Sequence, residues 1–222
     1  MAAPIEFEVQ QLKEEVINMW TLVRAQLQKA KNAVVNYDSD LAREVIVKER
    51  RVNGYELKID RDCENIFALR TPVAVDLRFV LAVLKINNNL ERIGDIAEGI
   101  AKHVLNTDKP FSQELLKRSK VLDMLDVSFS ILDDALAAFE NENTILARSI
   151  FQRDEFLDEI NLSSTDFAME YLKEKPEETE ELLYIYSIVR KIERIGDQTK
   201  NIAEEIIFYI EAKVLKHNND KA

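Results

Sequence analysis

The string Glu-Arg-Ile-Gly-Asp occurs twice in this chain, as Glu91–Asp95 and as Glu193–Asp197. Residues four apart share a helix face, so the two carboxylates of each copy repel each other by about 0.2–0.5 kcal/mol. A bound cation would offset that repulsion. Carboxylate oxygens are hard ligands that suit Mg²⁺, Ca²⁺, Mn²⁺ or iron and argue against structural zinc. The repeated string therefore predicts an oxygen-ligated metal site in each half of the chain.

The alternative is that these carboxylates belong to ordinary solvated surface, because 32% of the residues are charged. The repeat itself favours a ligand site, since nine identical residues align between 81–105 and 183–207. Each copy also keeps a glycine, Gly94 or Gly196, although glycine within a helix costs about 1 kcal/mol relative to alanine. Such a glycine makes room either for a neighbouring helix or for a ligand cluster, and the sequence leaves both explanations open.

The composition limits the class of protein. The chain has 222 residues and a net charge of −11, so nucleic acid and anionic membrane surfaces would repel it. No apolar stretch approaches the 18 residues typical of a membrane-spanning helix, and the N-terminus does not resemble a signal peptide. The single cysteine, Cys63, is expected to be a packing residue. We therefore expect a soluble cytoplasmic protein.

Apolar residues recur at three- to four-residue spacing along the whole chain, which predicts six long helices. They are expected at about residues 5–35, 40–69, 72–105, 112–140 and 144–175, and from 176 to a fraying end at His217–Asp220. Thr71 is expected to cap the third helix with Pro72 in its first turn, and Ser112 to cap the fourth. Three helices in each half predict an all-α fold of two tandem, pseudo-symmetric antiparallel three-helix bundles, residues 1–107 and 108–222.

The helical rotation of 100° per residue places the repeated carboxylates away from the core. One stripe of the third helix carries Ile86, Leu90, Ile93, Ala97, Ile100 and Val104, and the sixth helix repeats it with Ile188, Ile192, Ile195, Thr199, Ile202 and Ile206. The second helix adds an acidic stripe that includes Glu49, Asn53, Glu56 and Asp60, and the fifth carries Asp154, Asp158 and Asn161. If these helices are neighbours, each half presents a carboxylate-rich site at its surface.

Residues 79–84 and 182–186 are apolar on nearly every side of their helices. A helix that is apolar all round must be covered all round. We therefore expect the third and sixth helices to meet each other, or a second subunit, at their N-terminal halves. This pattern favours a homodimer.

Catalytic patterns are not evident in the sequence. His103 and His217 are the only histidines, and neither follows a Glu at the spacing used by di-iron bundles. There is no Gly-rich phosphate loop and no Gly-x-Ser-x-Gly elbow. The chain is not expected to be an enzyme.

The motifs taken together resemble the PhoU family of phosphate-uptake regulators. The resemblance rests on residues 90–97, on the preceding Pro72–Arg78, and on residues 192–197 with Asn201–Ala203. It covers essentially the whole chain. The resemblance implies two tandem three-helix bundles that bind iron, zinc or similar ions, often as dimers at the cytoplasmic side of the membrane. It also implies a role in coupling the ATPase of a phosphate-specific ABC transporter to a sensor histidine kinase, so that phosphate-starvation genes stay off when phosphate is plentiful.

Carried over to this chain, the resemblance implies metal ligands at Glu91, Asp95, Glu193 and Asp197. Contributions are expected from Glu49 and Asn53, from Asp154 and Asp158, and from Asn201. The first half has Gly99 where the second has Asn201, so the two sites are expected to be unequal. Two other functions stay open: a helical scaffold or dimerisation module without metal, and an accessory protein of a secondary phosphate transporter, for which degenerate strings would be expected.

Overall fold

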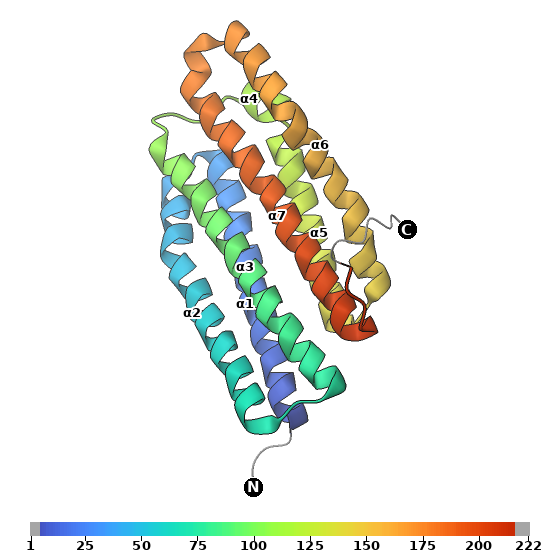
Figure 1. Ribbon diagram of the computed structural model, residues 1–222. Helices are drawn as coiled ribbons and strands as arrows, with labels where there is room; N and C mark the ends of the chain where they lie inside the picture. The colour runs from blue at the N-terminus through green and yellow to red at the C-terminus, as the bar shows by residue number, and fades with distance from the viewer. Residues whose placement is uncertain (1–4, 216–222) are drawn as a thin grey trace.

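The structure is a computed structural model that describes residues 5–215 and, within them, contains helices and no strand. The all-α prediction is confirmed. The long rods of Figure 1 lie nearly parallel to one another. In chain order the elements are α1 (Ile5–Asn36), α2 (Ser39–Arg70), α3 (Ala74–Asn106), α4 (Gln113–Arg118), α5 (Val121–Asn141), α6 (Thr144–Glu174), the 3₁₀ turn η1 (Pro176–Glu178) and α7 (Thr179–Glu211).

Side chains cap the N-terminal ends of three helices, close to the boundaries expected from the sequence. Asp38, Ser112 and Asn143 each accept a hydrogen bond from a backbone N–H in the first turn of α2, α4 and α6. These bonds satisfy backbone donors that the helix itself leaves unpaired. Most helix boundaries therefore follow from local chemistry. The fraying end expected at His217–Asp220 lies outside the described residues.

The expectation of one helix over 112–140 is wrong, because the chain breaks between α4 and α5. Lys120 adopts a left-handed conformation at φ 56°, and its N–H bonds to the carbonyl of Lys117 rather than to a residue four back. Leu116 and Val121, on the two sides of the break, are both buried. The described chain therefore has seven α-helices instead of the expected six in all.

The expected start of α3 is also wrong. Thr71 takes a left-handed conformation that closes α2, and Val73 is extended, so the helix begins at Ala74 rather than at Pro72. No side chain caps this end. The α6–α7 connection differs in a similar way, since Pro176 opens a 3₁₀ turn and α7 begins at Thr179.

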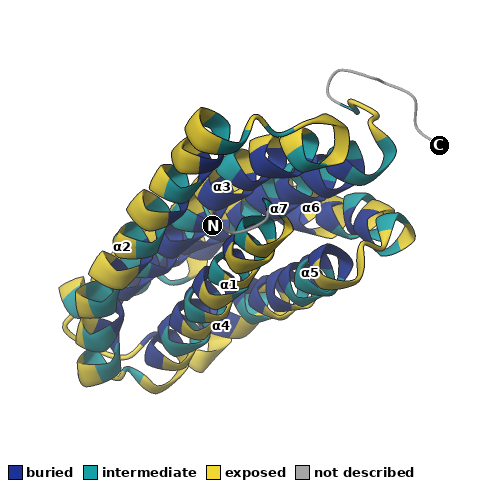
Figure 2. Cartoon of the chain, turned by 90° about the horizontal axis from the view of Figure 1, so that it is seen from below, coloured by how far each residue is buried: buried dark blue, intermediate teal, exposed yellow. Residues whose placement is uncertain are grey.

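The helices form two groups that pack against each other. In Figure 1, α1, α2 and α3 lie together, α5, α6 and α7 form the other group, and α3 lies beside α7. In Figure 2 the residues coloured as buried lie on the inward sides of the helices, and exposed residues lie on their outward sides. The predicted boundary at residue 107 falls in the connection between α3 and α4. The division into two domains, residues 1–107 and 108–222, stays a prediction, and the two groups share one core.

The α3 and α7 helices meet each other, but not through their N-terminal halves. Phe79 near the start of α3 contacts the ring of Tyr209 near the end of α7, with ring centroids 5.4 Å apart. At the opposite end, the His103 and Tyr184 rings lie 5.3 Å apart. The two helices therefore run antiparallel, as Figure 1 also shows, and the predicted contact of their N-terminal halves with each other is wrong. Contact of these halves with a second subunit stays a prediction.

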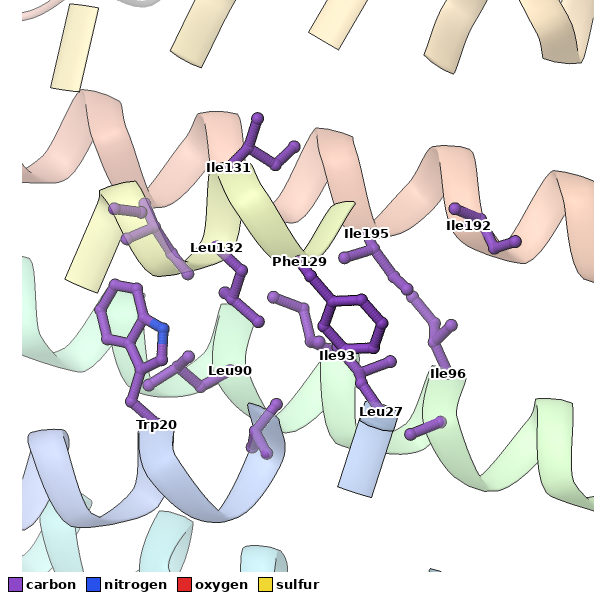
Figure 3. Close-up of a cluster of buried hydrophobic side chains, with 14 of the residues drawn as sticks. Trp20, Leu27, Leu90, Ile93, Ile96, Phe129, Ile131, Leu132, Ile192 and Ile195 are labelled. Atoms are coloured by element: carbon purple, nitrogen blue, oxygen red, sulfur yellow. The ribbon is translucent and has the colours of Figure 1, made fainter. Parts of the chain in front are cut away.

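The core continues through the contact between the two groups. Figure 3 shows Trp20 and Leu27 of α1, Leu90, Ile93 and Ile96 of α3, Phe129, Ile131 and Leu132 of α5, and Ile192 and Ile195 of α7 in one cluster of buried side chains. Every residue of the two predicted core stripes is fully buried. Arg24 of α1 adds a two-bond ion pair to Asp133 of α5, at 2.8 and 2.9 Å. These contacts hold α3 and α7 in place and turn their acidic faces outward.

Candidate metal centre

The first acidic cluster lies between α2 and α3. We use this name for Glu49, Asn53 and Glu56 of α2 with Glu91 and Asp95 of α3. The two helices pack along their length, and the charges of Asp95 and Glu49 act on each other across the contact. Helix spacing alone puts Glu49, Asn53 and Glu56 on one face of α2. Tertiary packing then brings that face opposite the first motif.

Buried oxygen atoms in this cluster lack hydrogen-bond donors. Glu49 is only 8% exposed, and its Oε2 accepts a bond of 2.9 Å from Nδ2 of Asn53. Oε1 of Glu49 and Oδ1 of Asn53 are buried and have no hydrogen-bond partner. An unsatisfied buried acceptor costs about 1–3 kcal/mol. Two such acceptors from adjacent turns of α2 form an arrangement that a cation would satisfy.

Negative charge in the first cluster is only partly offset, because Lys102 and Arg92 act on Glu49 and Glu91 by charge from a distance. Burial, followed by the charges of Asp95, Glu56 and Glu49, raises the pKa of Glu91 to about 7. Burial and neighbouring carboxylates also raise the pKa values of Glu49 and Glu56. Within residues 5–215, none of these carboxylates forms an ion pair within 4.0 Å of a Lys or Arg side chain.

The second acidic cluster lies between α6 and α7 and already contains a cation. It comprises Asp154 and Asp158 of α6 with Glu193, Asp197 and Lys200 of α7. The Lys200 ammonium donates a hydrogen bond of 2.7 Å to Oδ2 of Asp154 and lies 3.7 Å from Oδ1 of Asp197. Asp154 is 1% exposed, and its Oδ1 has no hydrogen-bond partner. The second motif is thus arranged around an internal ion pair.

The pKa shifts in the second cluster reflect this pair. Burial raises the pKa of Asp154, whereas the hydrogen bond and charge of Lys200 oppose the rise. Burial disfavours the charged form of Lys200, but the bond to Asp154 and the charges of Asp154, Asp197 and Asp158 outweigh burial and raise its pKa. Lys200 is therefore an ammonium ion near neutral pH. Glu193 has a raised pKa through burial and the charges of Asp197, Asp158 and Asp154.

The two motif glycines make room for different neighbours. A Cβ on Gly94 would lie 3.0 Å from Cγ1 of Val52, so this glycine allows α2 to approach α3. A Cβ on Gly196 would lie 2.2 Å from Oδ1 of Asp154, so this glycine makes room for a carboxylate. Both glycines thus make room for side chains of a neighbouring helix, and room for a metal-ligand cluster stays a prediction.

Other residues named from the sequence take different places. Asp158 is exposed and influences Glu193 by charge. Asn201 is half-buried, one turn beyond Asp197. Its counterpart Gly99 faces α7, where a Cβ would lie 2.8 Å from the ammonium of Lys191. Sequence reasoning missed Lys200, although the signal was available, since Glu98 stands at the same offset in the first half.

Neither cluster is a preassembled metal site. In the part of the chain that the structure describes, no three His, Cys, Asp or Glu side chains are grouped so that they could hold a metal ion. The residues of the first cluster nonetheless fit a cation in their chemistry, because they combine unpartnered buried oxygens with an excess of negative charge. The second cluster does not fit one in the same way, because an ammonium already bonds its most buried carboxylate.

Comparison with known proteins agrees with both the motifs and the fold. The PhoU domain model matches residues 16–104 and again residues 121–206. The chain belongs to the PhoU family. Relatives include the phosphate-specific transport system accessory protein PhoU of Edwardsiella tarda, which is 35% identical over 210 residues, or 95% of this chain and 86% of that protein. The Escherichia coli protein of the same name is 34% identical with the same coverage.

Solved PhoU structures share the fold over nearly the full length. The crystal structure of PhoU from Pseudomonas aeruginosa has a TM-score of 0.85 and 29% identity, covering 95% of this chain and 100% of that chain. The phosphate transport system regulatory protein PhoU from Streptococcus pneumoniae has a TM-score of 0.86 and 28% identity, with 96% and 99% coverage. Among helices within residues 5–215, none has the length and hydropathy needed to span a membrane.

Proposed function

We propose that this PhoU-family chain is a cytoplasmic regulator that couples a phosphate-specific ABC transporter to a sensor histidine kinase. In this role it lowers phosphate uptake and keeps phosphate-starvation genes off when phosphate is plentiful. The observation that carries the proposal is the match to PhoU proteins over 95% of this chain, with both copies of the PhoU domain present. Relatives are named as accessory or regulatory proteins of phosphate transport. The role is binding and regulation rather than catalysis.

Partners would bind at exposed apolar side chains of this chain. Leu69, Val73 and Val75 surround the connection between α2 and α3 and are 72%, 68% and 58% exposed. Exposed apolar residues that cluster on a surface are typical of protein–protein contacts. The transporter ATPase, the kinase and a second copy of the chain are the partners that this proposal includes. The buried apolar residues of α3 and α7 pack against each other and are not available to a partner.

A metal ion in this proposal binds at the first cluster. Glu91 and Asp95 would hold it with Glu49 and Asn53, whose unpartnered oxygens lie on the adjacent helix. Oxygen ligands suit iron, Mn²⁺, Mg²⁺ or Ca²⁺, and zinc is a further candidate within the family. The ion would supply positive charge that balances the carboxylates and joins α2 to α3. The side chains must converge to bind it, since they are not grouped for coordination in the structure.

A deletion strain carrying a phosphate-starvation reporter tests the regulatory role. In phosphate-rich medium, deletion should leave the reporter active, and the wild-type chain supplied in trans should restore repression. Leu69→Ser and Val73→Ser test the docking surface, because both side chains are exposed and their loss should not unfold the chain. Exposed Leu162 on α6, replaced by Ser, is the matched control. Unchanged repression after deletion would rule out the proposed function.

Elemental analysis separates this proposal from a metal-free helical scaffold. Protein purified without chelator should contain metal, and Glu91→Gln should reduce the amount, because it removes a charged ligand while preserving shape. Arg92→Gln changes the charge next to the site without removing an oxygen ligand and serves as the control. Metal-free protein under every loading condition would favour the scaffold function.

A further inference from the structure

Lys200 forms an ion pair with a carboxylate of the second cluster, and the carboxylates of the first cluster have no such pair within residues 5–215. Its ammonium bonds to Asp154, the most buried carboxylate of either cluster, and lies within ion-pair distance of Asp197. The lysine is itself about one-third exposed, so its stem crosses the surface and its charged end points inward. Asp154 and Lys200 are 46 residues apart in sequence and meet only because α6 packs on α7.

The duplication provides an internal comparison. At the offset of 102 that aligns the two motifs, Glu98 stands where the second half has Lys200. The charge of Glu98 raises the pKa of Glu49 in the first cluster. The equivalent position therefore adds negative charge to the first cluster and positive charge to the second. One turn further along the charges are swapped, with Lys102 in the first half and Glu204 in the second. Lys102 bonds to the partly exposed Glu98 on its own helix and acts on Glu49 only by charge, whereas Lys200 bonds directly to the buried Asp154 of the neighbouring helix. The halves therefore differ in what their lysine bonds to.

We propose that Lys200 is the built-in cation of the second cluster, so that this chain binds metal through its first half alone. The proposal rests on the metal site of the proposed function and limits it to one cluster. A divalent ion between Asp154 and Asp197 would stand where the ammonium is and would repel it. The ammonium would have to leave Asp154, so the loss of this hydrogen-bonded ion pair would weaken metal binding at the second cluster.

Gly196 supports a permanent rather than an occasional pair. Asp154 lies so close to the backbone of α7 that a Cβ at residue 196 would be 2.2 Å from Oδ1 and 2.7 Å from Cδ1 of Leu157. The carboxylate thus packs against the backbone of α7 at Gly196 and is bonded by Lys200 one turn further along the same helix. This arrangement fixes the pair within the packing of α6 against α7. The first half would then respond to metal while the second keeps a constant structure.

Mn²⁺ binding to the metal-stripped full chain tests the proposal, with stoichiometry measured by isothermal titration and by electron paramagnetic resonance. The wild type should bind at one class of site per chain. The double variant Glu91→Gln, Asp95→Asn should lose affinity by about 100-fold or more, beyond the 10- to 100-fold typical of residues that only orient ligands. The matched variant Glu193→Gln, Asp197→Asn should bind as the wild type does. Loss of Mn²⁺ binding in this second variant would overturn the proposal.

Lys200→Thr tests the lysine directly, with Lys191→Thr on the same helix as the control. Lys200→Thr should bind one additional Mn²⁺ per chain and should gain more thermal stability from Mn²⁺ than the wild type does. A folded Lys200→Thr chain without additional Mn²⁺ would refute the proposal. If Lys200→Thr does not fold, the two carboxylate variants decide the question.

Failure of the proposed function gives a different result. A wild type that binds no Mn²⁺ would refute metal binding at the first cluster. In that case a gain of Mn²⁺ in Lys200→Thr would still support the role of Lys200, and no gain would refute it.

Discussion

Alanine substitutions at three helical glycines should have three different effects on stability. All three glycines lie inside helices with ordinary negative φ, so alanine fits their backbone conformation. A Cβ on Gly54 would meet nothing within 4 Å. On Gly94 it would lie 3.0 Å from Val52, and on Gly196 it would lie 2.2 Å from Asp154. The stabilisation from replacing glycine by alanine in a helix is the same at each position. The neighbouring atoms therefore decide whether each variant is more or less stable than the wild type.

The expected magnitudes follow from these contacts. Alanine in place of glycine within a helix contributes about 1 kcal/mol, so Gly54→Ala should raise the free energy of unfolding by about that amount. Gly94→Ala adds overpacking of about 1–3 kcal/mol against Val52 and should be destabilising by about 1 kcal/mol. Gly196→Ala must displace Asp154 from Lys200, and breaking a buried pair costs about 3–5 kcal/mol, so a net loss of about 2–4 kcal/mol is expected.

Urea denaturation followed by circular dichroism at the helical band measures all three variants under identical conditions. If the slope of the free energy of unfolding against urea concentration is unchanged, the folded state has kept its compactness. In an Asp154→Ser background, the cost of Gly196→Ala should fall, because one of its two clashing neighbours is gone. If Gly196→Ala proved as stabilising as Gly54→Ala, Asp154 would not lie against α7, and the account of the second cluster would be refuted.

Two further predictions concern the first cluster and the core. Burial and neighbouring charges raise the pKa of Glu91 from 4.5 to about 7, so the folded, metal-free chain binds more protons than the unfolded chain in this range, and stability falls as pH rises through it. Glu91→Gln should reduce this loss of stability by about 1 kcal/mol, after allowance for solvent screening. Urea unfolding of the wild type and the variant at pH 5 and pH 8 measures the difference. If the free energy of unfolding changed equally with pH in both proteins, the prediction would be contradicted. Phe79→Ala should destabilise the chain by about 3–5 kcal/mol, because the 6% exposed ring contacts both Phe139 and Tyr209. Thermal unfolding tests this, and a loss below about 1 kcal/mol would indicate that the two helix groups do not share a core there.

Local signals explain why most of the fold could be predicted. The apolar spacing identified the core stripes of α3 and α7, and capping residues such as Ser112 marked where helices begin. The errors lie where backbone conformation departs from local preference. Lys120 and Thr71 both adopt left-handed φ values without being glycine, so their residue types do not announce the breaks that they make.

The relation of α3 to α7 was harder to predict for a different reason. An apolar surface shows that a helix must be covered, but it does not show the direction of the covering helix. The contact of Phe79 with Tyr209 joins residues 130 apart in sequence, and this pairing makes the two helices antiparallel. Such contacts depend on the packing of whole bundles.

The sequence by itself determined that the chain is helical, that it is duplicated, and that each half carries a Glu–Asp pair facing away from its core. These properties follow from residue type and from spacing along one helix. The tertiary structure decided which charges surround each pair, because those charges come from neighbouring helices. It opposed Glu49 to Asp95 in one half and bonded Lys200 to Asp154 in the other. Identical motifs therefore lie beside different buried partners.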